Sequence, residues 1–284
     1  MRRLRGQIQD DKKQKLTTLA RQARVDVLTM IQNAGSGNPG SALSCVEILT
    51  WLLHHEMHLE NANPKWENRD RLVLSKGHAA PVFYSLVTHF GWVGRDELSR
   101  FRCFGTRLQT HPDYQKLPCI DFPSGSLGQG LSAANGMSLA ARYLGLSEPR
   151  FFVLIGDGEL QEGQIWEAAM TAGHYGLENV IAIIDRNFFQ GDAAIVETMT
   201  LEPIVEKWQA FNWQVQTAEG HDFVSLSTAF SAFEEGKPKL IIANTVKGKG
   251  VSFMEKNNNW HVGGKKFTAE KLGAALEEIN GKAS

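Results

Sequence analysis

Hydrophobic positions along the chain follow two spacings, one typical of helices and one of buried strands. Residues 16–31 place apolar side chains three and four positions apart, which predicts an amphipathic helix. Continuous apolar runs at 151–155 and 180–184 predict strands that are buried on both faces. Further helices are expected at 41–55, 79–90, 127–144, 162–175, 201–210, 222–233 and 268–279, and further strands at 71–74, 213–217 and 239–243. This alternation predicts an α/β fold, a parallel sheet with helices on both faces.

The chain shows no internal division. We find no linker rich in Pro or Ser, no repeat and no low-complexity segment. The simplest organisation is therefore an N-terminal tail at 1–14 followed by one domain at 15–284. A hydrophobic content of 42 % and a charged content of 21 % are ordinary for a globular protein of 284 residues.

Charge and cysteine content narrow the function classes. The net charge of −1 gives no reason to expect nucleic acid or an anionic membrane as a partner. No signal-peptide pattern and no apolar run near 20 residues is present, so a cytoplasmic location is expected. Cys45, Cys103 and Cys119 fit neither a zinc pattern nor a disulfide framework, and we expect reduced thiols.

Two of the predicted strands end in residues that carry oxygen ligands. The first runs into Gly156-Asp157-Gly158, and the second runs into Asp185-Arg186-Asn187. Ligands of open α/β sheets bind past the carboxyl ends of the strands. A carboxylate and an amide oxygen suit Mg²⁺ or Ca²⁺, which often shares such a site with phosphate oxygens. The glycines would let the backbone approach a diphosphate closely.

A Gly-Asp-Gly turn alone is usually only a tight turn, but its surroundings make it specific. Asn187 follows Asp157 by about 30 residues, and this spacing resembles the thiamine diphosphate motif. Residues 156–168, 174–179 and 187–192 resemble the transketolase family. The resemblance implies that Asp157, Asn187 and the backbone carbonyl of Phe189 hold Mg²⁺, for which Ca²⁺ or Mn²⁺ can substitute. It also places Gly158, Glu159 and Asn187 against thiamine diphosphate.

Three histidines match family positions. His78 lies in a segment, 69–79, that resembles the one delivering a histidine to the cofactor or donor. His111 matches a histidine that contacts the donor sugar. His261 matches one that bridges the diphosphate and the reacting centre and transfers protons, and Lys247 upstream of it is assigned to the cofactor by the same resemblance. Each histidine alone has a structural alternative, for example as a helix cap.

A glycine-rich turn and two acidic residues complete the match. Residues 122–132 resemble the family turn that lines the cofactor, with Ser126 where the family often has Pro. The resemblance assigns the cofactor-binding residues Ser41, Gly125, Ser126 and Leu127. Glu162 and Glu167 match carboxylates that link two active sites across a subunit contact, and Glu162 is counted among the catalytic residues. Acidic residues also favour the start of a helix, which is the structural alternative.

One position departs from the family pattern. The family has Ser-Gly-His-Pro-Gly with a substrate-contacting histidine, whereas this chain has Ser36-Gly37-Asn38-Pro39-Gly40. Asn38 can form hydrogen bonds but cannot carry a proton at neutral pH. The substitution indicates either a changed donor or acceptor or a tolerated exchange. We assign Asn38, His111 and His261 to the substrate.

The resemblance covers residues 15–280 and stops before the family's pyrimidine-binding domain. In the family, that domain supplies the glutamate that protonates the aminopyrimidine and most substrate-phosphate contacts. The resemblance therefore implies the N-terminal subunit of a split transketolase, inactive by itself. Its expected partner is a C-terminal subunit that carries the pyrimidine-binding domain, in a heterotetramer of two chains of each kind. The expected reaction is transfer of a two-carbon ketol unit from a ketose to an aldose, with sugars or sugar phosphates as substrates.

Two alternatives remain open on the sequence alone. The same metal motif serves subunits that decarboxylate 2-oxo acids or transfer acyl or acyloin groups, and Asn38 keeps this possibility open. A non-catalytic scaffold subunit could also keep the fold. The retained pair of Asp157 and Asn187 argues against the scaffold.

Overall fold

The computed structural model describes residues 8–60, 63–146, 149–191 and 193–281. Residue 192 and residues 1–7 of the expected tail lie outside them, and the division into tail and domain stays a prediction. The helices are α1 (Asp10–Ala34), α2 (Pro39–Ser44), α3 (Val46–Trp51), α4 (Ala80–Val87), α5 (Gln129–Tyr143), α6 (Gly163–Tyr175), α7 (Ile195–Thr198), α8 (Ile204–Ala210), α9 (Phe223–Ser231) and α10 (Ala269–Gly281). The strands are β1 (Arg71–Leu74), β2 (Phe151–Gly156), β3 (Val180–Arg186), β4 (Phe189–Gln190), β5 (Ala193–Ala194), β6 (Gln214–Glu219) and β7 (Lys239–Asn244).

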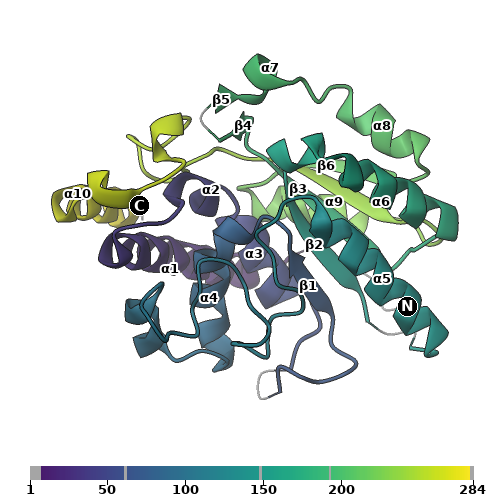
Figure 1. The fold of residues 1–284 in the computed structure, drawn as a ribbon, viewed down its shortest axis with the longest axis horizontal. Coiled ribbons are helices and arrows are strands. Elements are labelled where there is room, and N and C mark those ends of the chain that lie inside the picture. Colours follow the sequence, from purple (N-terminus) through teal and green to yellow (C-terminus); the bar gives the residue numbers. More distant parts are fainter. Residues whose placement is uncertain (1–7, 61–62, 147–148, 192, 282–284) are drawn as a thin grey trace.

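Five strands form one parallel sheet in the order β1-β2-β3-β7-β6 (Figure 1). The register pairs Gly156 of β2 with Asp185 of β3. The carboxyl ends of these two central strands therefore lie side by side. The predicted α/β fold with a parallel sheet covered on both faces is confirmed.

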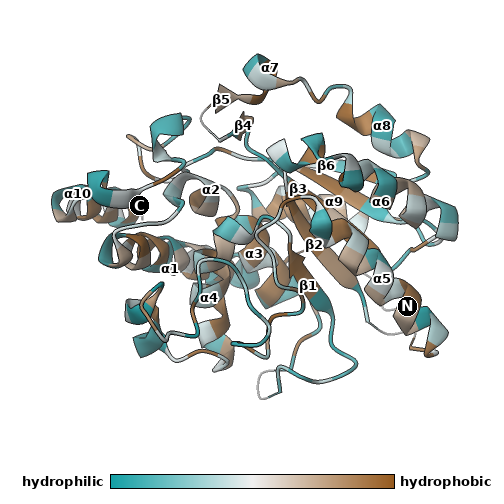
Figure 2. Ribbon diagram, viewed as in Figure 1, coloured by the Kyte–Doolittle hydropathy of each residue, from teal (hydrophilic) through white to brown (hydrophobic). Residues whose placement is uncertain are grey.

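Alternate residues of the strands enter two separate hydrophobic cores. In β2, Phe152 and Leu154 pack among residues of α1, α3, α4 and α9, whereas Val153 and Ile155 pack among residues of α5, α6 and α8. Both faces of each central strand are thus buried, and Figure 2 shows these strands as the hydrophobic centre of the fold. This is the physical reason for their uninterrupted apolar sequences.

Several expected boundaries were wrong. The helix expected at 41–55 is divided into α2, α3 and a π-helical turn, Leu52–Glu56. The division falls at Cys45. The hydroxyl of the preceding residue, Ser44, donates to the Ser41 carbonyl oxygen at 2.9 Å and to Asp185. Such side-chain hydrogen bonds compete with the backbone hydrogen bonds of a helix. Helix α1 begins at Asp10, before the expected residue 16.

Two further differences concern the segment after β3. Helix α8 begins at Ile204, later than expected, because Pro203 disfavours helical backbone at the residue before it. The short antiparallel pair β4–β5 was not predicted, since two-residue strands have no readable periodicity.

No helix in the described ranges is long and apolar enough to cross a membrane.

Candidate functional site

The two predicted oxygen ligands meet at the carboxyl edge of the sheet. Asp157 and Asn187 are both buried there. One Asp157 oxygen accepts from the Gly158 N–H at 2.9 Å and the other from the Phe188 N–H at 2.5 Å. Phe188 has φ of 69°, which is uncommon for a bulky residue. The aspartate therefore fixes the turn after β2 and the backbone directly after Asn187.

A cavity of about 280 Å³ opens beside this pair. Most of the predicted site residues line it: Ser41, His78, Leu127, Asp157, Gly158, Glu159, Glu162, Asn187, Phe189 and His261. They come from six regions of the sequence, namely the N-terminal helices, the end of β1, the turn before α5, the loop after β2, the loop after β3 and the loop before α10. The fold thus brings together groups that lie far apart in the sequence and were assigned to one site by their motifs.

The lining fits a diphosphate held by a cation. A Cβ on Gly158 would lie 2.6 Å from Gln190 Cβ, so only glycine leaves this space open. The Oε1 atom of Gln190, which also lines the cavity, is buried and lacks a hydrogen-bond partner among the described residues. No group of three His, Cys, Asp or Glu side chains in the described ranges forms a metal cage. A cation here would need oxygens from its ligand.

The electrostatic environment of Asp157 also favours a bound cation. Burial, followed by the nearby Asp185, raises the pKa of the Asp157 carboxyl to about 7. A buried carboxylate with this pKa is poorly compensated by the protein alone. A bound cation would favour its ionised form.

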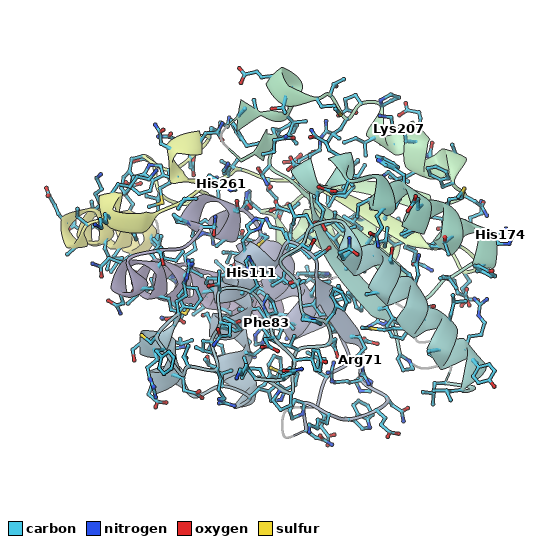
Figure 3. All side chains as sticks on the ribbon, in the orientation of Figure 1. Arg71, Phe83, His111, His174, Lys207 and His261 are labelled. Carbon is cyan, nitrogen blue, oxygen red and sulfur yellow. The ribbon has the colours of Figure 1, made fainter. Side chains whose placement is uncertain are left out.

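The three predicted histidines lie near one another. Figure 3 shows His111 and His261 over the N-terminal helices. The rings of His78 and His261 lie 6.1 Å apart between centroids. Burial lowers the pKa of His78 well below its usual value, and the Lys76 charge lowers it further. Burial also lowers the pKa of His111, followed by the effect of Arg102, so the His78 and His111 imidazoles are neutral at pH 7.

Five predicted residues lie outside the cavity lining: Asn38, His111, Gly125, Ser126 and Lys247. Asn38 Nδ2 donates to the backbone carbonyl of His261 at 2.9 Å. A Cβ on Gly125 would lie 3.2 Å from His111 Nδ1, so this loop and this ring are in close contact. Asn38 thus contacts a residue that lines the cavity, and Ser126 directly precedes another, Leu127.

The two glutamates that line the cavity occupy different environments. Glu159 is buried and accepts from the Gly128 N–H at 2.8 Å, the Gly156 N–H at 3.0 Å and the Ser75 hydroxyl. Its carboxylate therefore joins the ends of β1 and β2 to the start of α5. Glu162 is exposed at the rim of the cavity, at the start of α6.

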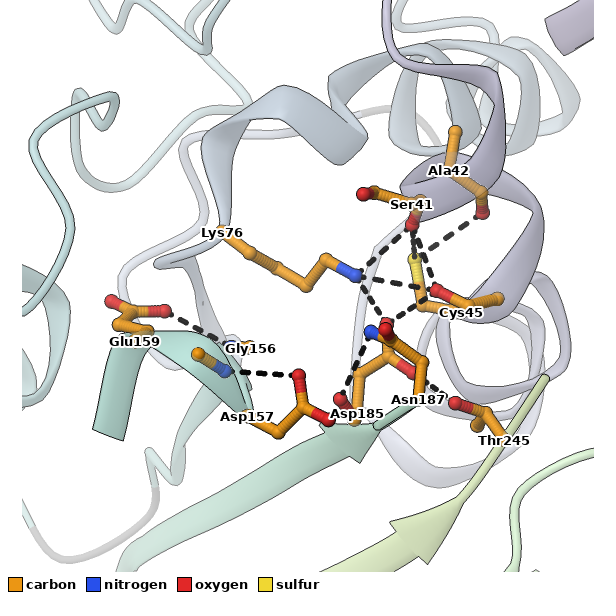
Figure 4. Close-up of polar contacts among 12 residues, drawn as sticks. Ser41, Ala42, Cys45, Lys76, Gly156, Asp157, Glu159, Asp185, Asn187 and Thr245 are labelled. Carbon is orange, nitrogen blue, oxygen red and sulfur yellow. Dashed lines mark hydrogen bonds and ion pairs between the residues drawn. The ribbon is translucent and has the colours of Figure 1, made fainter. Parts of the chain in front are cut away.

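A buried ion pair beneath the site has no counterpart among the residues predicted from the sequence (Figure 4). The Lys76 ammonium pairs with Asp185 and donates to the Ser41 carbonyl at 3.0 Å. Asp185 also accepts from the hydroxyls of Ser44, at 2.6 Å, and Thr245. The pair ties the end of β1 to the strand that leads into Asn187. Lys76 lies two positions before His78, but a lysine in a sequence gives no sign of its burial.

We expect Lys76→Met to lower the free energy of unfolding by about 3–5 kcal/mol, because it leaves Asp185 buried without its counter-charge. Urea denaturation of the cofactor-free chain measures this. Lys15→Met removes an exposed lysine and should change stability by less than about 0.5 kcal/mol. Equal stability of both variants would contradict the prediction.

This arrangement is that of an α/β domain that binds a diphosphate-bearing cofactor at the carboxyl edge of its sheet. A family model described as "Transketolase, thiamine diphosphate binding domain" matches residues 15–279. The chain belongs to the transketolase family.

Relatives include two proteins named as transketolase subunits. The chain is 42 % identical to the 6-deoxy-6-sulfo-D-fructose transketolase subunit SqwG of Clostridium sp. (strain MSTE9), over 89 % of this chain and 91 % of that protein. It is 37 % identical to an apulose-4-phosphate transketolase subunit of Phocaeicola vulgatus, over 90 % of this chain and 91 % of that protein. The solved transketolase of Leishmania mexicana superposes with a TM-score of 0.87 at 28 % identity, over 93 % of this chain and 41 % of that one.

These matches confirm the predicted family, the fold and the class, an N-terminal thiamine diphosphate-binding subunit of a split transketolase. The chain spans about two fifths of the longer transketolases and nearly all of the separate subunits. The roles of the individual site residues stay predictions.

Proposed function

We propose that this chain and a C-terminal transketolase subunit together transfer a two-carbon ketol unit from a ketose to an aldose. Mg²⁺ would be held by Asp157, Asn187 and the Phe189 carbonyl and would bind the diphosphate of the cofactor. The observation that carries the proposal is the juxtaposition of Asp157 and Asn187 at paired strand ends beside a cavity that Gly158 keeps open.

Thiamine diphosphate, when bound, supplies a carbon nucleophile and an electron sink for cleavage of the C–C bond. The protein's own residues bind and orient it. Gly158 leaves room for the diphosphate, and Lys247, which is buried close to Phe189, adds a positive charge nearby. Ser41 and Leu127 line the same cavity, with Gly125 and Ser126 in the turn that leads to Leu127.

Histidine side chains suit hydrogen bonding to donor hydroxyls and proton transfer. A neutral imidazole offers one donor and one acceptor, so it can hold a hydroxyl and accept its proton. His78 and His261 line the cavity, and His111 lies against the Gly125 turn. We assign His111 and His261 to the donor sugar and His78 to the cofactor or donor.

A partner chain is supported by the surface next to the cavity. Phe188, Val196 and Met199 are large apolar residues exposed on the segment after β3. Glu162 and Glu167 are exposed at the start of α6. Such a surface suits burial against a second protein chain. We propose a heterotetramer of two chains of each kind, in the cytoplasm, where the free thiols of Cys45, Cys103 and Cys119 would stay reduced.

The donor is expected to depend on Asn38. The names of the two related subunits specify different sugars, one a sulfonated deoxyfructose and one apulose 4-phosphate. Asn38 is bonded to the backbone of His261, a residue that lines the cavity. The family histidine at this position would present a titratable ring in place of a fixed amide.

We therefore expect Asn38→His to change the ratio of kcat/KM between two ketose donors by about tenfold, while the affinity for thiamine diphosphate stays within about threefold. A panel of ketoses, assayed with the assembled enzyme, measures the ratio. Asn259→His, an exposed exchange in the loop that carries His261, is the matched control. An unchanged ratio would mean that the exchange is merely tolerated.

The proposed function is tested by purifying the chain in complex with its C-terminal partner and measuring ketol transfer with thiamine diphosphate and Mg²⁺. Transfer from xylulose 5-phosphate or another ketose supports the proposal. Turnover of pyruvate in place of every ketose would support the 2-oxo acid alternative. Failure of the assembled complex to bind the cofactor would support the scaffold alternative.

A further inference from the structure

A line of hydrogen bonds runs from α1 to the segment 245–250, which carries Lys247. Arg24 pairs with Glu47 through contacts of 2.6 and 2.8 Å. Glu47 Oε2 lies 2.8 Å from His221 Nδ1, and the Val246 N–H donates to His221 Nε2 at 2.8 Å. These groups come from α1, α3, the turn before α9 and the segment after β7, so four distant parts of the sequence meet here.

The direction of the bonds determines the state of His221. Because the Val246 N–H is a donor, His221 Nε2 must accept and therefore carries no hydrogen. The ring proton then lies on Nδ1 and is donated to Glu47. Burial alone would raise the pKa of Glu47, but the Arg24 charge and the bonds from His221 and Arg24 lower it to about 2. Glu47 is thus a permanent carboxylate that orients the imidazole.

The same group holds the segment at a second point. Arg24 Nε donates to the Lys249 carbonyl at 3.1 Å. Gly250, with φ of 97°, lies so close that a Cβ there would be 3.1 Å from Arg24 Nε. Backbone contacts at Val246 and Lys249 therefore stand on either side of Lys247.

The place of this segment determines where the Lys247 ammonium lies. Lys247 is buried, donates to Asn258 Oδ1 at 3.0 Å and lies 5.5 Å from the Phe189 ring centroid. The Gly248 N–H donates to the Gly40 carbonyl at 2.9 Å, next to Ser41. The segment thus touches two predicted cofactor-binding regions. Glu47 and His221 themselves line a different cavity, of about 310 Å³, and do not face the site.

We propose that Glu47 and His221 are positioning residues for the cofactor, holding segment 245–250 so that Lys247 meets the diphosphate. This inference rests on the proposed function. It assigns the affinity for thiamine diphosphate in part to side chains that never touch it.

The test compares His221→Phe, which removes both bonds, with His221→Gln, whose carbonyl oxygen can still accept from the Val246 N–H. Amide hydrogen exchange of residues 245–250 is measured on the cofactor-free chain. The affinity for thiamine diphosphate with Mg²⁺ is measured by calorimetry on the complex with the C-terminal subunit. His89→Phe, the exchange of an exposed histidine in the 3-10 turn after α4, is the control.

We expect His221→Phe to speed exchange at Val246 and to weaken cofactor affinity by about tenfold, as loss of an orienting residue behind a binding group does. His221→Gln should keep both within about threefold of the unchanged protein. Unchanged exchange and affinity in His221→Phe would overturn the proposal, and so would equal losses in both variants, which would indicate a merely structural role. If the unchanged complex bound no cofactor, the proposed function and this inference would both fail. If the unchanged complex bound the cofactor normally but His221→Phe did not speed hydrogen exchange at Val246, this inference would fail and the proposed function would stand.

Discussion

The purified chain alone is expected to show no measurable ketol transfer, which means at least about a thousandfold less activity than the assembled enzyme. The reason is chemical. The family resemblance places the proton-donating glutamate on the pyrimidine-binding domain and assigns that task to none of the described carboxylates that line the cavity. Glu159 is fully engaged with the backbone of Gly128 and Gly156. Glu162 lies exposed at the rim.

The measurement is ketol transfer from xylulose 5-phosphate with thiamine diphosphate and Mg²⁺, first with the pure chain and then with the C-terminal subunit present. The mixture is its own positive control. The C-terminal subunit by itself serves as the second control, because it would lack the metal ligands. Measurable transfer by the pure chain would contradict the split-enzyme assignment, whereas activity that appears only in the mixture is the expected result.

Asp157→Asn is expected to weaken the Mg²⁺-dependent binding of thiamine diphosphate at least about a hundredfold and to abolish ketol transfer. The substitution removes the charge that Mg²⁺ requires and turns one oxygen acceptor into a donor. Asp157 accepts from both the Gly158 N–H and the Phe188 N–H. The new amide can satisfy only one of these groups, so the loop that carries Asn187 would also shift.

Calorimetric titration of the assembled complex with thiamine diphosphate, with and without Mg²⁺, measures this loss. Asp96→Asn exchanges an exposed carboxylate and should bind as the unchanged protein does. Melting of the cofactor-free chain shows whether the variant is folded. A folded Asp157→Asn complex that bound the cofactor with unchanged affinity would rule out Asp157 as a metal ligand.

Some parts of the fold were predictable because a single local property decides them. The strands expected at 151–155 and 180–184 agree closely with β2 and β3, since burial on both faces requires uninterrupted apolar residues. The helix at 41–55 was expected to be continuous and is not, because Ser44 bonds to Asp185, which lies 141 residues further along the chain. Periodicity cannot report such a contact.

The residues of the candidate site were also predictable only in part. Asp157 and Asn187 were predicted as ligands because each directly follows a strand, and the pairing of the two parallel strands brings them to the same edge of the sheet. Lys76, Asp185 and Gln190 were missed as parts of the site. Their importance comes from burial and from partners that no local pattern specifies.

The sequence by itself determined the family, the alternation of helices and strands, and the residues at the strand ends, because these depend on hydrophobic spacing and on motifs read within about 30 residues. Only the tertiary structure decided which charges are buried together, which histidines are neutral and how segment 245–250 is held. The Lys76–Asp185 pair spans 109 residues, and the Glu47–His221 contact spans 174. Such contacts arise when the helices pack against the sheet, and their energies depend on the desolvation that this packing produces.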